Sequence, residues 1–161
     1  MYRFVSILSA LFLALVSAGP AAAAKPEVLS IVAKTLEICL ENLEQPRAMA
    51  KAAKGLGYAN IHTEGGLEYY LVKNRVVFGK SQTNGRKGYC FIHGSRMSEA
   101  EASAILAPAV KGAKQIVIQQ RNVVKAWTRN IGGQTYVLGV LDWIELPLIN
   151  GHAILIEKAR R

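Results

Sequence analysis

Apolar residues recur at spacings of three and four in the first part of the chain, once residues 1–24 are set aside. After Pro26, which suits the first turn of a helix, these positions are Leu29, Val32, Leu36, Cys39 and Leu43. A second, shorter helix is predicted from Pro46 to Lys54, where Gly55 is well placed to end it. Two amphipathic helices are therefore expected before the first strand.

Alternating apolar residues then predict strands. After a loop predicted from Gly57 to Gly66, strands are expected at Leu67 to Val72 and Val76 to Phe78, on either side of a turn. The apolar run Tyr89 to Ile92 predicts a further strand, because it is short and rich in aromatic and β-branched side chains.

A capped helix follows this strand. Ser98 and Glu101 have the spacing of a capping box, in which each side chain satisfies a backbone N–H of the first helical turn. Pro108 interrupts the helical pattern and is expected to kink or shorten the helix. The apolar positions on one helix face are Ala102, Ile105, Leu106, Ala109 and Val110.

The remainder of the chain predicts a strand meander. Strands are expected at Gln115 to Gln119, Val123 to Thr128 and Thr135 to Leu141, and a short hairpin is predicted across Asn150–Gly151, between Leu148–Ile149 and Ala153–Ile156. The order of elements indicates an α+β fold, with an antiparallel sheet of about five to seven strands and two or three helices packed on one face. About 137 residues, 25–161, are enough for a single domain.

Residues 1–24 have the pattern of a secretory signal peptide. A short positive start precedes a mostly apolar run from Phe4 to Val16, and small residues lead to a cleavage site expected after Ala23 or Ala24. The apolar run is shorter than the roughly 20 residues needed to span a bilayer. We therefore expect a periplasmic or secreted protein with no transmembrane segment once the signal is removed.

The sequence contains two cysteines, Cys39 and Cys90. Exported proteins meet an oxidising compartment, so a disulfide between these residues is the leading interpretation, and two buried free thiols are the alternative. The sequence has no Cys-x-x-Cys motif, and no Cys or His pair has the spacing of metal ligands. No cofactor and no metal are therefore expected.

These features together resemble small uncharacterised exported proteins of bacteria. The residues that carry the resemblance are the cysteine of the leading helix, the Gly-Leu-Gly-Tyr stretch from Gly55 to Tyr58, the strand that ends near Cys90 and the capped helix. The resemblance covers roughly Pro26 to Gly112. It implies a secreted, disulfide-linked α/β module and transfers no active site.

The charge is unevenly distributed along the chain. Residues 65–130 hold eleven Lys or Arg against three Glu, whereas basic and acidic residues balance in 25–64 and in 131–161. The candidate binding residues lie on or beside two successive predicted turns, and they are Lys73, Arg75, Lys80, Arg86 and Lys87. If they share one surface, it would bind phosphate or carboxylate groups of a lipid, a glycan or an acidic protein. A solvated surface that only keeps the protein soluble is the alternative.

A second group of cations surrounds an aromatic residue. Arg121, Lys125 and Arg129 lie near Trp127, a pattern that also suits single-stranded nucleic acid. Export argues against nucleic acid as a partner, and a position in the core is the favoured interpretation of Trp127.

Catalytic motifs are absent from the sequence: it has no Gly-x-Ser-x-Gly, no phosphate-binding loop, no Gly-x-Gly-x-x-Gly and no His-Glu-x-x-His. A hydrolase would need a histidine beside a carboxylate. The candidates are His62, His93 and His152, with Glu64, Asp142 and Glu145.

The sequence therefore favours an exported, non-enzymatic binding module that presents a basic surface to an anionic envelope component or protein. A small periplasmic hydrolase with a His/carboxylate site is the alternative. A lipid carrier is a third, and it would require an open cavity between helices and sheet.

Overall fold

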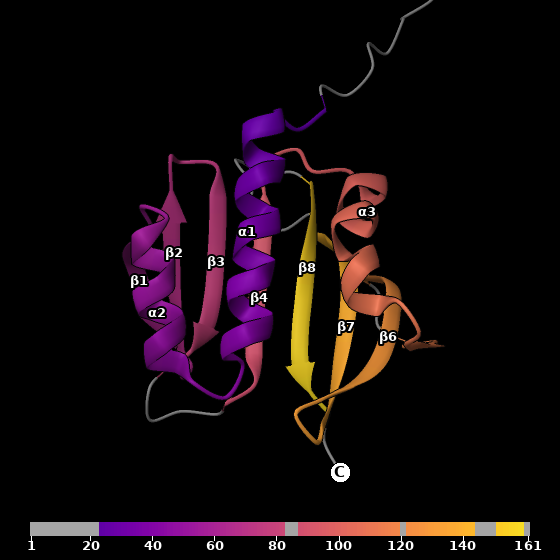
Figure 1. Cartoon of the computed structure of the whole chain (residues 1–161). Coiled ribbons are helices and arrows are strands. Elements are labelled where there is room, and N and C mark those ends of the chain that lie inside the picture. The colour runs from indigo at the N-terminus through magenta and orange to yellow at the C-terminus, as the bar shows by residue number, and fades with distance from the viewer. Residues whose placement is uncertain (1–22, 83–86, 120–121, 144–150, 160–161) are drawn as a thin grey trace, which may run out of the picture.

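A computed structural model describes residues 23–82, 87–119, 122–143 and 151–159. These residues form three helices and one eight-stranded sheet in which every neighbouring pair is antiparallel. The helices lie on one face of the sheet (Figure 1). The α+β class is confirmed, and the prediction of five to seven strands is too low.

The helices are α1 (Pro26–Asn42), α2 (Pro46–Gly55) and α3 (Glu99–Val110). The strands are β1 (Ala59–Glu64), β2 (Leu67–Val72), β3 (Val76–Ser81), β4 (Tyr89–Gly94), β5 (Lys114–Ile116), β6 (Val123–Ile131), β7 (Gln134–Trp143) and β8 (Gly151–Lys158). Their order across the sheet is β1-β2-β3-β4-β8-β7-β6-β5, so the last strand lies between β4 and β7 at the centre. No helix in the described part of the chain is long and apolar enough to cross a membrane.

Strand β1 corrects the prediction of a loop at Gly57 to Gly66. All six of its residues are exposed, and β1 is an edge strand that pairs only with β2. An exposed strand has no buried face, so its sequence lacks the apolar alternation that indicates a strand.

Two further predictions change in detail. Strand β5 is limited to Lys114–Ile116, and it does not reach Gln119. Both edges of β8 are occupied by β4 and β7, so Ala153–Ile156 does not form the short hairpin expected across Asn150–Gly151. Leu148 to Asn150 lie outside the described residues.

Helix α1 packs against the centre of the sheet. Val32 and Cys39 are fully buried in the main core, and Cys39 forms a disulfide with Cys90 of β4. The predicted disulfide is confirmed. Gly94 allows the close approach of helix and strand, because a Cβ there would lie 3.0 Å from the side chains of Val28 and Val32.

Helix α3 is anchored at both ends. The predicted capping box is present, with the Ser98 hydroxyl accepting from the Glu101 N–H and the Glu101 carboxylate accepting from the Ser98 N–H. At the other end the Arg129 guanidinium of β6 donates to the Ala109 carbonyl, which satisfies one of the open carbonyls of the last turn. The helix extends two residues beyond Pro108, to Val110.

The disulfide generates a test of stability. Replacing Cys39 and Cys90 with Ala should lower the free energy of unfolding by up to about 4 kcal/mol, because the bond closes a loop of 51 residues in sequence separation. Urea unfolding with and without reductant measures this loss. Reductant should leave the double Ala variant unchanged, and an equal effect on both proteins would contradict the prediction.

Candidate functional site

A basic hollow of about 670 Å³ lies at the end of the sheet where α1 begins. Its cationic side chains come from three separate segments: the residue before α1, the turn between β2 and β3, and the turn after β4. The lining residues are Ala23, Lys25, Val28, Lys73, Asn74, Arg75, Ser95 and Arg96. We refer to this feature as the basic hollow.

The β2–β3 turn brings two residues of the basic hollow into unusual backbone conformations. Lys73 and Asn74 have φ of 50° and 52°, and the Arg75 N–H donates to the Val72 carbonyl at 3.0 Å. A turn with positive φ at both central positions favours Asn and Gly. Lysine at the first of these positions is therefore costly for the backbone.

The turn after β4 also contains a non-glycine residue with positive φ. Arg96 has φ of 62°, and the Met97 N–H donates to the Gly94 carbonyl at 3.0 Å. The Ser95 N–H donates to the Arg75 carbonyl at 2.8 Å, which joins the two turns. Every non-glycine residue with positive φ in the described part of the chain therefore lines the basic hollow. Strained backbone of this kind clusters at functional sites.

Four cations and one carboxylate set the charge of the basic hollow. Glu27, in the first turn of α1, forms an exposed ion pair with Lys73. The hydrogen bond and charge of Lys73, helped by the charges of Arg75 and Lys25, hold the pKa of Glu27 below its ordinary value. The Arg96 side chain has no such partner among the described residues. The arrangement leaves an excess of positive charge that can hold an anion through charge-assisted hydrogen bonds.

The structure brings together only part of the predicted basic patch. Lys73 and Arg75 line the basic hollow, whereas Lys87 lies just before β4, at the opposite end of the β3–β4 pair. Lys80 is fully buried, and Arg86 lies outside the described residues. Sequence reasoning missed Lys25 and Arg96, because nothing local in the sequence shows that the start of α1 and the turn after β4 meet.

Lys80 is buried beside polar partners from its own and the neighbouring strand. Its ammonium lies 2.8 Å from the Glu68 carboxylate and donates to the Ser81 carbonyl at 3.0 Å. The Tyr70 hydroxyl also donates to Glu68, and burial together with that carboxylate raises the pKa of Tyr70 to about 12. A buried lysine needs such partners, so Lys80 belongs to the protein interior.

The second predicted cation group holds α3 in place. The Lys125 ammonium lies 2.7 Å from the Glu99 carboxylate, and Arg129 binds the Ala109 carbonyl. Trp127 is partly buried against the main core. Arg121 lies outside the described residues.

The three histidines lie in different environments. His62 Nε2 lies 3.2 Å from the Glu64 carboxylate, but both side chains are exposed on edge strand β1. His152 lies opposite Asp142 in the β7–β8 ladder, and its charge helps to lower the pKa of Glu99 at the start of α3. Glu145 lies outside the described residues. The described residues also contain no group of three or more His, Cys, Asp or Glu side chains that could hold a metal ion.

His93 is buried, and neither of its ring nitrogens has a hydrogen-bond partner. Burial, with a smaller contribution from the charge of His152, lowers the pKa of His93 to about 4. The ring is therefore neutral in the folded protein at neutral pH.

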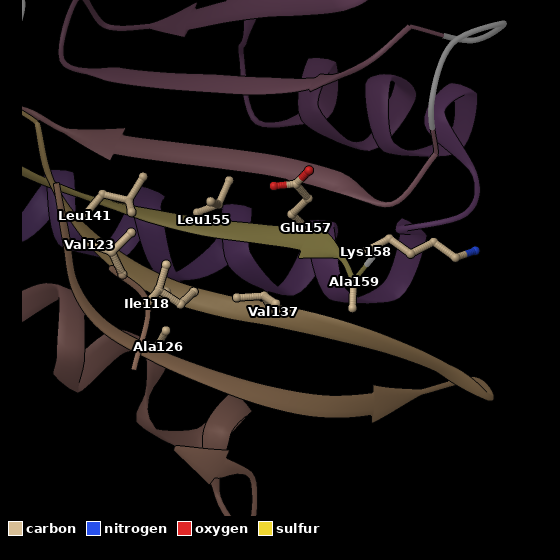
Figure 2. Close-up of a pocket in the computed structure, with 10 residues that line it drawn as sticks. Ile118, Val123, Ala126, Val137, Leu141, Leu155, Glu157, Lys158 and Ala159 are labelled. Carbon is tan, nitrogen blue, oxygen red and sulfur yellow. The ribbon is translucent and has the colours of Figure 1, made fainter. Parts of the chain in front are cut away.

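A second concave feature lies on the helix-free face of the sheet. This groove of about 390 Å³ has a floor of small residues, Ala126 and Gly139, and aliphatic walls that include Leu141 and Leu155. Figure 2 shows Glu157 and Lys158 at one end, with the Lys158 side chain pointing away from the groove. The other lining residues are Ile118, Val123, Val137 and Ala159.

The helix-covered face differs from what a lipid carrier would need. Residues from α1, α2 and the strands fill the space between helices and sheet, and Val32, Met49 and Phe78 are at most 1% exposed. The groove is on the opposite face.

A comparison with protein-family models, with curated proteins and with solved structures found no match for this chain.

The lowered pKa of His93 predicts an acid-sensitive fold. Below the ordinary pKa of 6.5 the unfolded chain binds a proton that folded His93 does not bind, so stability falls until pH reaches about 4. Between pH 7 and pH 5 this single group should lower the free energy of unfolding by about 2 kcal/mol.

Urea unfolding of a His93→Leu variant at several pH values measures the effect. The variant should lose this part of the pH dependence, whereas His62→Gln, at an exposed position, should keep it. An unchanged pH profile in His93→Leu would contradict the assignment.

Proposed function

We propose that this protein is an exported, non-enzymatic binding module that holds an anionic group of a cell-envelope component in its basic hollow. The observation that carries the proposal is that Lys73 and Arg96, two of the four cations, occupy backbone positions that favour glycine or asparagine. Stability alone would favour other residues at these positions. Binding of an anion would account for a cation at each position, in addition to the ion pair that Lys73 forms with Glu27.

The charge and position of the basic hollow support the same proposal. Lys25, Arg75 and Arg96 are exposed, so their charged groups are accessible to a ligand. The first turn of a 17-residue helix adds positive potential at the same place. Guanidinium groups suit phosphate and carboxylate oxygens in particular, because they can donate two parallel hydrogen bonds.

The buried disulfide supports the exported location, because such bonds persist in oxidising compartments. The hydrolase alternative gains little support from the histidines. His62 has its carboxylate partner on an exposed edge strand, and the His93 ring is buried without a partner.

Vesicle binding tests the proposal. The purified processed protein should bind vesicles containing phosphatidylglycerol and leave phosphatidylcholine vesicles unbound, and affinity should fall as salt is raised. Arg75→Gln and Arg96→Gln should each weaken binding about tenfold or more, because a hydrogen bond to a charged group contributes about 1.5 to 3 kcal/mol.

Lys111→Gln and Lys114→Gln are matched controls, because they remove the same charge from exposed positions near the end of α3. Binding to a polyuronate, a glycan that carries carboxylates and no phosphate, is measured in parallel. It distinguishes a glycan carboxylate from a lipid phosphate as the ligand. If the control variants lost as much vesicle affinity as the variants of the basic hollow, binding would depend only on the overall surface charge, and the proposal would be wrong.

Lys73 allows binding to be separated from stability. Lys73→Gly should bind the anionic vesicles more weakly, but its free energy of unfolding should be unchanged or up to about 1 kcal/mol higher, because glycine adopts positive φ without cost. Lys87→Gly, at an exposed position without positive φ, should instead lower stability. A clear loss of stability in Lys73→Gly would mean that Lys73 is present for the fold.

A further inference from the structure

The residues that lead into α1 cross from the basic hollow into the core (Figure 1). Ala23 is exposed and lines the basic hollow. The next residue, Ala24, is only 7% exposed and belongs to the main core. Lys25 is exposed and lines the basic hollow again. The peptide bond between Ala23 and Ala24 therefore lies at the boundary between the hollow and the core.

This bond is one of two that the small-residue pattern offers for removal of a signal peptide. Cleavage after Ala23 and cleavage after Ala24 both have a small residue directly before the bond and another one two positions earlier. Only cleavage after Ala23 keeps the buried Ala24 in the folded domain. Loss of Ala24 would remove apolar surface from the core.

The start of α1 favours the same bond for a second reason. Lys25 is the residue before the helix, and its carbonyl accepts from the N–H groups of Val28 and Leu29 at 2.8 and 3.2 Å. A chain that began at Lys25 would place its terminal ammonium at the positive end of the helix, where a cation is unfavourable. In a chain that begins at Ala24, the ammonium lies one residue further from the helix.

We propose that processing cuts the bond between Ala23 and Ala24, and that the α-ammonium of Ala24 becomes a fifth cation of the basic hollow. The reaction is a hydrolysis. Water adds across the bond between the Ala23 carbonyl carbon and the Ala24 nitrogen, the new carboxylate leaves with residues 1–23, and the ammonium stays on the domain. A positive charge thus replaces Ala23 in the wall of the hollow. This inference rests on the proposed function, because the ammonium is assigned to the same anion.

The α-ammonium differs from the other cations of the basic hollow in its titration. An α-amino group ordinarily has a pKa of about 8, whereas lysine and arginine side chains ordinarily titrate above about pH 10. Four cations and one carboxylate surround this position, and a bound anion would raise the pKa of the ammonium above its value in the free protein. The charged groups are Lys25 and Glu27 at the start of α1, Lys73 and Arg75 in the β2–β3 turn, and Arg96 after β4. Anion binding should therefore weaken between pH 7 and pH 9.

The intact mass of the exported protein tests the position of the cut. We expect the mass of residues 24–161 with one disulfide, and a chain that begins at Lys25 or at any other residue would overturn the inference. A precursor that lacks Ala24 should be cut after Ala23 and give a chain that begins at Lys25. Its unfolding equilibrium constant should be roughly fivefold higher or more. Equal stability of the two processed chains would overturn the structural argument for this bond.

Phosphatidylglycerol vesicles test the role of the ammonium. The affinity of the processed wild type should fall about two- to fivefold from pH 7 to pH 9, the effect of one exposed charge. Selective acetylation of the α-amino group should cause the same loss at pH 7 and abolish the pH dependence. Lys111→Gln removes a charge elsewhere and should keep the pH dependence. If acetylated and unmodified proteins bind alike, the ammonium is not part of the site, and only the proposed function stands.

A measurement without ligand separates this inference from the proposed function. The pKa of the α-amino group, taken from the pH dependence of its acetylation rate, should be lower in the folded protein than in the urea-unfolded chain, because the nearby cations outnumber the carboxylate. Arg96→Gln should raise this pKa, whereas Lys111→Gln should leave it unchanged. If this pattern holds but vesicles do not bind at any pH, the proposed function fails and the position of the ammonium stands. An equal pKa in the folded and unfolded chains would overturn that position.

Discussion

The packing of α1 on β4 is the contact on which the rest of the structure depends. A disulfide joins Cys39 to Cys90, and the missing side chain of Gly94 lets Val28 and Val32 approach the strand. The disulfide at Cys39 and the close contact at Gly94 therefore hold the helix against the sheet at two positions along its length. Because α2 follows α1 through a short connection, the position of α1 also determines how α2 covers the first strands.

The basic hollow is a consequence of this packing. The start of α1 places Lys25 and Glu27 beside the β2–β3 turn, and the end of β4 places Arg96 beside the same turn. The backbone bond from Ser95 to Arg75 holds the two turns together. Residues 25, 75 and 96 are distant in sequence, and they meet only because α1 begins where β4 ends.

The sequence predicted the parts of the fold that depend on local patterns. The amphipathic α1, the capping box at Ser98 and the pairing of the two cysteines follow from spacing and from redox chemistry. Strand β1 was missed because an exposed edge strand has no apolar alternation. The basic patch was predicted only in part: the burial of Lys80 depends on Glu68 in the neighbouring strand, a contact that sequence position does not show.

The position of β8 has a consequence for how the protein folds. The strand made after all the others occupies the centre of the sheet, between β4 and β7. Until β8 has emerged, β4 and β7 each lack a neighbour, and the halves of the sheet on either side remain unconnected. The β7–β8 pairing is close in sequence, but the β4–β8 pairing joins residues more than sixty positions apart, such as Cys90 and Ile156, and pairings this distant form slowly. The two parts of the sheet therefore become one continuous sheet only when β8 enters between β4 and β7.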